Sequence, residues 1–156
     1  MMKTRIAVIA LAISFMAVAA SFAAGPHIGN WKLNEGKSKL AKGTGKNSTV
    51  TYSDERRDKV KVTVDGVDKD GKAVHSVWVG KFDGKAYKVK NNPAYDMVAY
   101  KMVNDRTNEI TAMKDGKTVW TGTIAVSADG KMRTINISGT GADGKKWKTK
   151  AVYDKA

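Results

Sequence analysis

Residues 114–153 read KDGKTVWTGTIAVSADGKMRTINISGTGADGKKWKTKAVY, and this stretch decides the fold. It contains three Asp-Gly-Lys tripeptides, and the runs between and after them alternate apolar and polar residues. Asp-Gly between alternating runs is a strong signal for a β-hairpin, because glycine takes a positive φ at little steric cost and aspartate tolerates one. We therefore expect consecutive antiparallel strands joined by tight turns.

The same tripeptide occurs earlier, at 70–72 and 83–85. Three of the four spacings between successive tripeptides are 13 or 14 residues, and the remaining one, of 32, leaves room for two more strands. Alternation predicts strands at 28–33, 48–52, 59–64, 73–82, 86–89, 97–103, 108–114, 118–127, 132–140 and 146–154. Such strands form a sandwich or a barrel, and regular sequential turns favour an all-β, antiparallel up-and-down barrel of about 8–10 strands, which leaves no open edge.

Turn length decides which side chains face the interior. A two-residue turn at 129–130 places Trp120, Gly122, Ile124, Val126, Arg133, Ile135, Ile137 and Gly139 inside. A two-residue turn at 70–71 places Val60, Val62, Val64, His75, Val77 and Val79 inside. At 115–116 a three-residue loop with a bulge fits better, because it joins Ile110 and Ala112 to the face of Trp120.

Residues 1–23 are predicted to be a signal peptide. Lys3 and Arg5 precede an apolar run from Ile6 to about Ala20, and Ser21 and Ala23 supply small residues before a cleavage site. Residues 24–156 then form one domain, with no transmembrane segment, and we expect a periplasmic or secreted protein. The chain has no cysteine, which excludes disulfides, thiol nucleophiles and a lipid-modified cysteine.

The net charge is +13, and +11 without residues 1–23, which carry two basic residues and no acid. This charge attracts polyanions, and in an exported protein the abundant ones belong to anionic envelope surfaces. The alternative is that the lysines only keep the protein soluble. We do not expect nucleic-acid binding, because Lys146, Lys148 and Lys150 lie on the strand face opposite Trp147 and Tyr153.

No catalytic, metal or cofactor motif is visible, so we expect a protein that is not an enzyme. Residues 68–71 echo part of a calcium loop, but the first and last ligand positions are Gly66 and Val77. His75 adjoins Ser76, and strand parity puts the two on opposite faces. His27 lies in a short N-terminal tether that we expect to be mobile.

The candidate ligand-binding residues are His75, Tyr87, Tyr100, Trp120, Arg133, Trp147 and Tyr153. Arg133 is predicted to point inward among isoleucine and valine side chains. It would there pair with a protein carboxylate or with the anionic head of a ligand. The alternative is a position at the rim, where the guanidinium reaches water. Each aromatic residue is also explained by ordinary core packing.

Several segments resemble small exported bacterial proteins with a lipocalin-like domain. They are Gly29-Asn30-Trp31, Trp31-Lys32-Leu33-Asn34, Lys37-Ser38-Lys39, 49–52, 62–68, 81–85 and Val152-Tyr153, and they span nearly all of residues 24–156. The resemblance implies a calycin-type barrel in which Trp31 plugs one end.

The last strand is also similar to that of fatty-acid-binding proteins. In that family an arginine two residues before the tyrosine holds the ligand carboxylate. Here that place is Ala151, so only Tyr153 carries over. The helical lid of that family does not fit into 33–46, and the C-terminal helix of true lipocalins is missing.

The sequence therefore leads to two hypotheses. The first is an exported lipocalin-like barrel that binds a small apolar or amphipathic ligand, anionic if Arg133 faces it, in its interior. The second is a basic, envelope-associated protein with a filled core and no small-molecule ligand.

Overall fold

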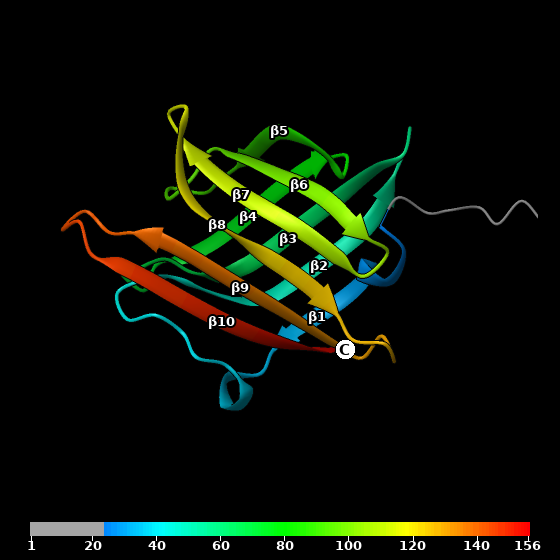
Figure 1. Ribbon diagram of the computed structural model, residues 1–156, viewed down its shortest axis with the longest axis horizontal. Helices are drawn as coiled ribbons and strands as arrows, with labels where there is room; N and C mark the ends of the chain where they lie inside the picture. Colours follow the sequence, from blue (N-terminus) through cyan, green and yellow to red (C-terminus); the bar gives the residue numbers. More distant parts are fainter. Residues whose placement is uncertain (1–23) are drawn as a thin grey trace, which may run out of the picture.

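A computed structural model describes residues 24–156, so the expected signal peptide, 1–23, lies outside the described residues. Ten strands follow one another along the chain (Figure 1). They are β1 (Gly29–Leu33), β2 (Lys46–Glu55), β3 (Lys59–Val67), β4 (Ala73–Gly80), β5 (Asp83–Lys90), β6 (Met97–Asn104), β7 (Thr107–Lys114), β8 (Lys117–Val126), β9 (Met132–Thr140) and β10 (Lys146–Lys155). Two single 3₁₀ turns, Gly25–His27 and Glu35–Lys37, precede β1 and β2.

The strands form a closed antiparallel barrel with up-and-down topology. Every strand pairs with its neighbours in the chain, and β1 also pairs with β10, which closes the ring. The predicted fold is therefore confirmed. Closure leaves no free sheet edge, which is how all-β proteins avoid edge-to-edge aggregation.

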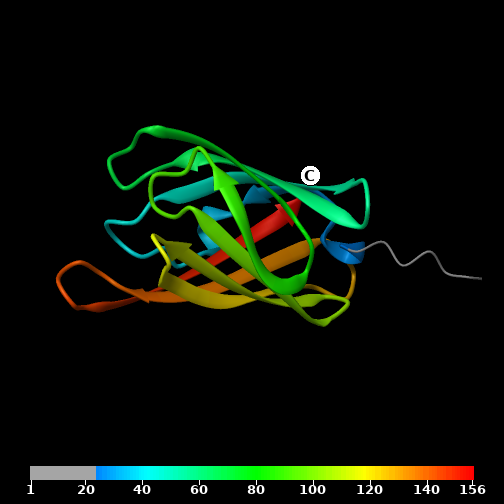
Figure 2. The ribbon, with the colours of Figure 1, turned by 90° about the horizontal axis from the view of Figure 1, so that it is seen from above.

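The barrel has two distinct ends, which Figure 2 shows at the left and right of the molecule. The segments 34–45, 68–72, 91–96 and 141–145 lie at one end. The turns 56–58 and 127–131 and the N-terminal turn Gly25–His27 lie at the other. Each inward-facing side chain therefore has a depth between these ends, set by its place along its strand.

The register predicted for β8 and β9 is confirmed. Val126 lies opposite Arg133 and Ile124 opposite Ile135, so Arg133 faces the interior. At 115–116 the predicted bulge is present, because Ala112 pairs with Trp120 and Met113 with Thr118. The loop itself has two residues and not three, since Lys114 pairs with Lys117.

The register predicted for β3 and β4 is wrong by one residue. Asp65 pairs with His75 and Val64 with Ser76, around a three-residue loop closed by a hydrogen bond of 2.9 Å from the Asp68 N–H to the Lys72 carbonyl. A slip of one residue exchanges the two faces of a strand. Ser76 and Trp78 are therefore buried inside, while His75 and Val79 are exposed and Val77 shares their outer face.

Trp31 and His27 seal the end opposite the loops 34–45 and 68–72. Trp31 is fully buried, and its Nε1 donates a hydrogen bond of 2.8 Å to the carbonyl of His27. The His27 ring lies 6.1 Å from that of Tyr52 and 5.9 Å from that of Phe82. The expectation of a mobile tether at His27 is wrong, because this side chain is 1% exposed.

No helix among residues 24–156 has both the length and the apolar composition that a membrane crossing needs. At the 3₁₀ turn Glu35–Lys37, the Asn34 side chain accepts a hydrogen bond from the Lys37 N–H.

Candidate functional site

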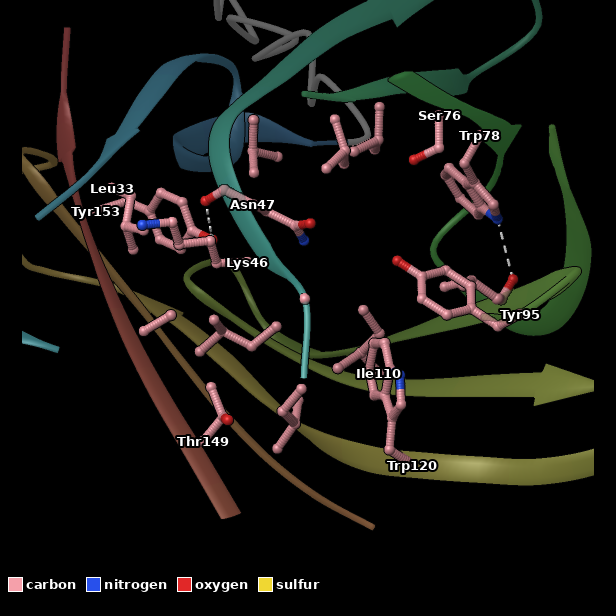
Figure 3. A pocket seen from close by; sticks show the side chains of 18 of the residues that line it. Leu33, Lys46, Asn47, Ser76, Trp78, Tyr95, Ile110, Trp120, Thr149 and Tyr153 are labelled. Atoms are coloured by element: carbon pink, nitrogen blue, oxygen red, sulfur yellow. Dashed lines mark hydrogen bonds between the residues drawn. The ribbon is translucent and has the colours of Figure 1, made fainter. Parts of the chain in front are cut away.

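A cavity of about 100 Å³ runs inside the barrel and widens, at the end that carries 34–45 and 68–72, into an opening of about 430 Å³. The two spaces share six lining residues, so they adjoin and are described below as the inner and outer parts of one site. These are Gly45, Asn47, Tyr95, Trp120, Ile137 and Thr149. Figure 3 shows the side chains of Trp78, Trp120 and Tyr153 around the inner space.

Arg133, near the start of β9, lines the inner cavity and is not among the residues that line the opening. Its side chain is 3% exposed. One guanidinium nitrogen, Nη2, donates a hydrogen bond of 2.8 Å to the hydroxyl of Tyr52. The guanidinium carbon lies 5.2 Å from the ring centre of Tyr52 and 5.0 Å from that of Tyr153. Two aromatic faces therefore hold the charged group in place.

No carboxylate of residues 24–156 forms an ion pair with Arg133, and its Nε has no hydrogen-bond partner among them. Burial also excludes the rim position in which the guanidinium would reach water. A buried charge without a counter-charge is costly, and an arginine side chain does not lose its proton in proteins. The site therefore offers an anion a positive, desolvated partner.

Three tyrosines surround Arg133 and carry hydroxyls into this apolar space. Burial raises the pKa of Tyr153 to about 12, although the nearby Arg133 opposes the shift. Burial likewise raises the pKa of Tyr100 well above its ordinary value. The Tyr153 hydroxyl donates a hydrogen bond of 3.0 Å to the carbonyl of Asn47. The phenols of Tyr100 and Tyr153 therefore stay neutral at physiological pH and act as hydrogen-bonding groups rather than as bases.

Aromatic side chains line the opening. Gly139 on β9 lies between Trp120 on β8 and Trp147 on β10, because it pairs with both. A Cβ on Gly139 would come within 2.6 Å of the Trp147 ring, so the missing side chain lets that indole lie over the strand. The Tyr95 ring meets that of Trp120 edge-on, with centroids 5.4 Å apart. Three aromatic rings, those of Tyr95, Trp120 and Trp147, therefore form part of the wall of the opening.

The structure brings together five of the seven predicted ligand-binding residues. Arg133, Tyr100, Trp120 and Tyr153 line the inner cavity, and Trp120 and Trp147 line the opening. His75 is exposed on the outer face beside Asp65, so the prediction that it lines the interior is wrong.

Tyr87 lines neither the inner cavity nor the opening. Its ring packs against Trp78, with centroids 5.7 Å apart, and its hydroxyl donates a hydrogen bond of 2.8 Å to Asp83. Trp31, predicted to be structural, lies in the sealed end and not in the cavity.

Sequence reasoning missed Trp78 and Tyr95. Trp78 was lost with the one-residue register error in β4, and a three-residue loop at 69–71 would have recovered it. Tyr95 lies in the segment 91–96, after Pro93, where no periodicity indicates which way a side chain points.

Two further polar side chains are buried at or near the sealed end. Neither ring nitrogen of His27 has a hydrogen-bond partner among residues 24–156, and burial, with a smaller effect of Arg133, lowers its pKa to about 4. Asn108 on β7 is fully buried, and neither of its side-chain polar atoms is paired within the same residues. Within residues 24–156, no group of three or more histidine, aspartate or glutamate side chains is placed to hold a metal ion.

No family model and no curated protein sequence matches the chain. Two solved structures have a similar shape. The redesigned β-barrel mFAP1 bound to DFHBI is 15% identical, with 86% of this chain and 100% of that chain covered and a TM-score of 0.47. EF1p2_mFAP2b bound to DFHBI is 9% identical, with 86% and 98% covered and a TM-score of 0.51. At such identities the second likeness shows the barrel fold and nothing finer.

Proposed function

We propose that this protein is an exported, lipocalin-like barrel that binds a small amphipathic anion in its interior. The observation that carries the proposal is Arg133, a buried residue that lines the cavity and forms no ion pair with any carboxylate of residues 24–156. An acidic ligand head would supply the missing counter-charge, and an apolar body would occupy the ring-lined opening.

Two further points support binding. The opening, at about 430 Å³, falls in the range of small-molecule pockets, roughly 300–1,000 Å³. EF1p2_mFAP2b, a barrel of similar shape, carries DFHBI. We propose binding rather than catalysis, because the phenols of Tyr100 and Tyr153 in the cavity have raised pKa values, stay protonated at neutral pH and are poor proton acceptors there.

Export is part of the proposal and rests on residues 1–23. If the segment is removed after Ala23, the mature protein begins at Ala24. N-terminal sequencing of the protein recovered from its host should find Ala24 first, and a chain that starts at Met1 would contradict export by this route.

Native mass spectrometry of the protein purified from its own host tests binding directly. We expect an additional stoichiometric mass that denaturation releases, and an acidic compound in the released fraction. A bare protein that also takes up nothing from a lipid extract of the host would overturn the proposal.

A second candidate function is adhesion to anionic surfaces. The observation in its favour is a row of exposed lysines on the outer face of β10, namely Lys146, Lys148 and Lys150. Exposed Lys39 extends the row, because its backbone forms two hydrogen bonds with that of Lys150. This function needs no occupied cavity, so it is compatible with the first.

A further inference from the structure

The two parts of the site differ in volume. The space that reaches Arg133 measures about 100 Å³, which is smaller than the roughly 150 Å³ apolar cavity that holds one benzene molecule. It therefore has room for a carboxylate and a few more atoms. The body of any larger ligand has to remain in the wider opening.

The opening is built for a compact body with flat faces. Trp120, Trp147 and Tyr95 line it, and Pro93 adds a fourth ring. The glycine at 139 lets the Trp147 indole lie flat over β9, and the edge-on contact between Tyr95 and Trp120 holds two rings at an angle. Aromatic pairs add roughly 0.5–1.5 kcal/mol beyond the area they bury, so these rings favour an aromatic ligand over an alkyl chain of equal size.

The charges at the opening limit the number of acidic groups. Asp68 and Asp70 line it together with one lysine, Lys69. The carboxylate of Asp68 is fixed by hydrogen bonds from the N–H groups of Asp70 (2.9 Å) and Lys72 (3.0 Å). A second anionic group on the outer part of a ligand would face these two acids, and like charges repel.

We propose that the ligand is a compact aromatic monocarboxylic acid, bound with the carboxylate at Arg133 and the ring system against Trp120 and Trp147. This rests on the proposed function and narrows it to one class of ligand. Long straight-chain acids are not the preferred class in this proposal, because the small inner cavity holds little more than the head and three aromatic rings stand in the wall around the remainder.

Isothermal titration calorimetry of the mature protein with three probes tests this. Naphthaleneacetate has the acid and the ring, naphthaleneacetamide has the ring without the charge, and dodecanoate has the acid without the ring. A hydrogen bond to a charged group contributes about 1.5–3 kcal/mol, so naphthaleneacetate should bind at least about tenfold more tightly than the amide. It should also bind more tightly than dodecanoate. These comparisons need no variant.

Trp147→Leu removes part of the ring wall, and Tyr87→Leu is the matched control, since Tyr87 lines neither space. We expect Trp147→Leu to weaken naphthaleneacetate by about three- to tenfold while leaving dodecanoate within about twofold. Tyr87→Leu should change neither. Circular dichroism of each variant checks that the barrel has formed.

The outcomes separate the two proposals. Tighter binding of dodecanoate, with no effect of Trp147→Leu, would overturn the aromatic class; if Arg133→Met then abolished dodecanoate binding, the proposed function would stand. Equal affinity for naphthaleneacetate and its amide would overturn the placement of the carboxylate at Arg133. If neither acid bound the protein stripped of ligand by denaturation and refolding, both proposals would fail.

Discussion

At the scale of single residues, variants of Arg133 distinguish a charge that serves ligand binding from one that stabilises the fold. The only side-chain hydrogen bond of Arg133 among residues 24–156 goes to the Tyr52 hydroxyl. Arg133→Met alone leaves that hydroxyl without its donor, which costs about 1–3 kcal/mol. Arg133→Met combined with Tyr52→Phe removes both polar groups, and we expect its ligand-free stability to equal or exceed that of the parent.

Urea unfolding of the two variants and the parent measures this. Loss of about 3–5 kcal/mol in the double variant would show that the guanidinium is a structural ion of the core, and would count against the proposed function.

His27 should make stability depend on pH. Burial, and to a smaller extent Arg133, lowers its pKa from 6.5 to about 4 in the folded protein. As pH falls, His27 binds its proton in the unfolded chain first. The free energy of unfolding therefore keeps its full His27 contribution above about pH 6.5 and loses it between pH 6.5 and about 4. Below about pH 4 His27 causes no further change. The loss amounts to about 3 kcal/mol.

Urea unfolding at pH 7.5 and pH 4.5 should therefore show a smaller pH effect in His27→Phe than in the parent. Carboxylates titrate in the same range, so the difference between variants is the quantity to read. Equal slopes for His27→Phe and the parent would mean that His27 is not buried as a neutral ring.

At the scale of strands, Gly122 sets how closely β8 approaches β9. A Cβ there would lie 2.0 Å from the Asn136 carbonyl oxygen and 2.8 Å from the Cα of Ile137, both of them backbone atoms. The two strands would have to separate. Gly122→Ala should therefore destabilise the barrel by about 1–3 kcal/mol, the usual cost of overpacking.

Thermal unfolding compares Gly122→Ala with Thr121→Ala, which lies one residue away on the exposed outer face. The control should stay within about 1 kcal/mol. A neutral Gly122→Ala would show that β8 and β9 adapt more easily than their pairing suggests.

The positions of the strands could be predicted from the sequence. The pairing register could be predicted only where all plausible loop lengths gave the same register. Around 129–130 every even-length loop keeps Ile124 opposite Ile135, and the structure closes a four-residue loop with that same register, through the Ser127 N–H and the Met132 carbonyl. Around 70–71 both faces of β4 are mixed, so alternation could not choose between a two- and a three-residue loop. The wrong choice moved His75 inward and Trp78 outward.

At the scale of the molecule, closure of the barrel could be predicted, and the content of its interior only in part. Arg133 was placed inside by register, but the missing carboxylate partner is a property of all ten strands together and has no local signal. Tyr95 and the sealing role of His27 depend in the same way on how segments without periodicity cross the barrel ends. Alternation in the sequence shows which face of a strand a side chain is on. How deep that side chain lies along the barrel axis is known only from the closed fold.

The net charge of +11 is a property of residues 24–156 as a whole, and the row of exposed lysines on β10 concentrates part of it on one side of the barrel. We expect the protein to sediment with vesicles of phosphatidylcholine and phosphatidylglycerol in equal parts at about 50 mM salt and to dissociate at about 500 mM. Each lysine near such a surface contributes about 1 kcal/mol, so replacing Lys146, Lys148 and Lys150 by glutamine should weaken binding about a hundredfold.

The matched control replaces Lys85, Lys88 and Lys90 by glutamine. These lysines are exposed on β5, which lies halfway around the closed ring from β10. It removes the same charge from the opposite side of the barrel. If the β10 row is the contact surface, the control should weaken vesicle binding far less than the β10 variant, because only charges that face the membrane lie within a Debye length of it. Equal losses would mean that net charge alone drives association, and the lysines of β10 would then be no more than a solvated outer face.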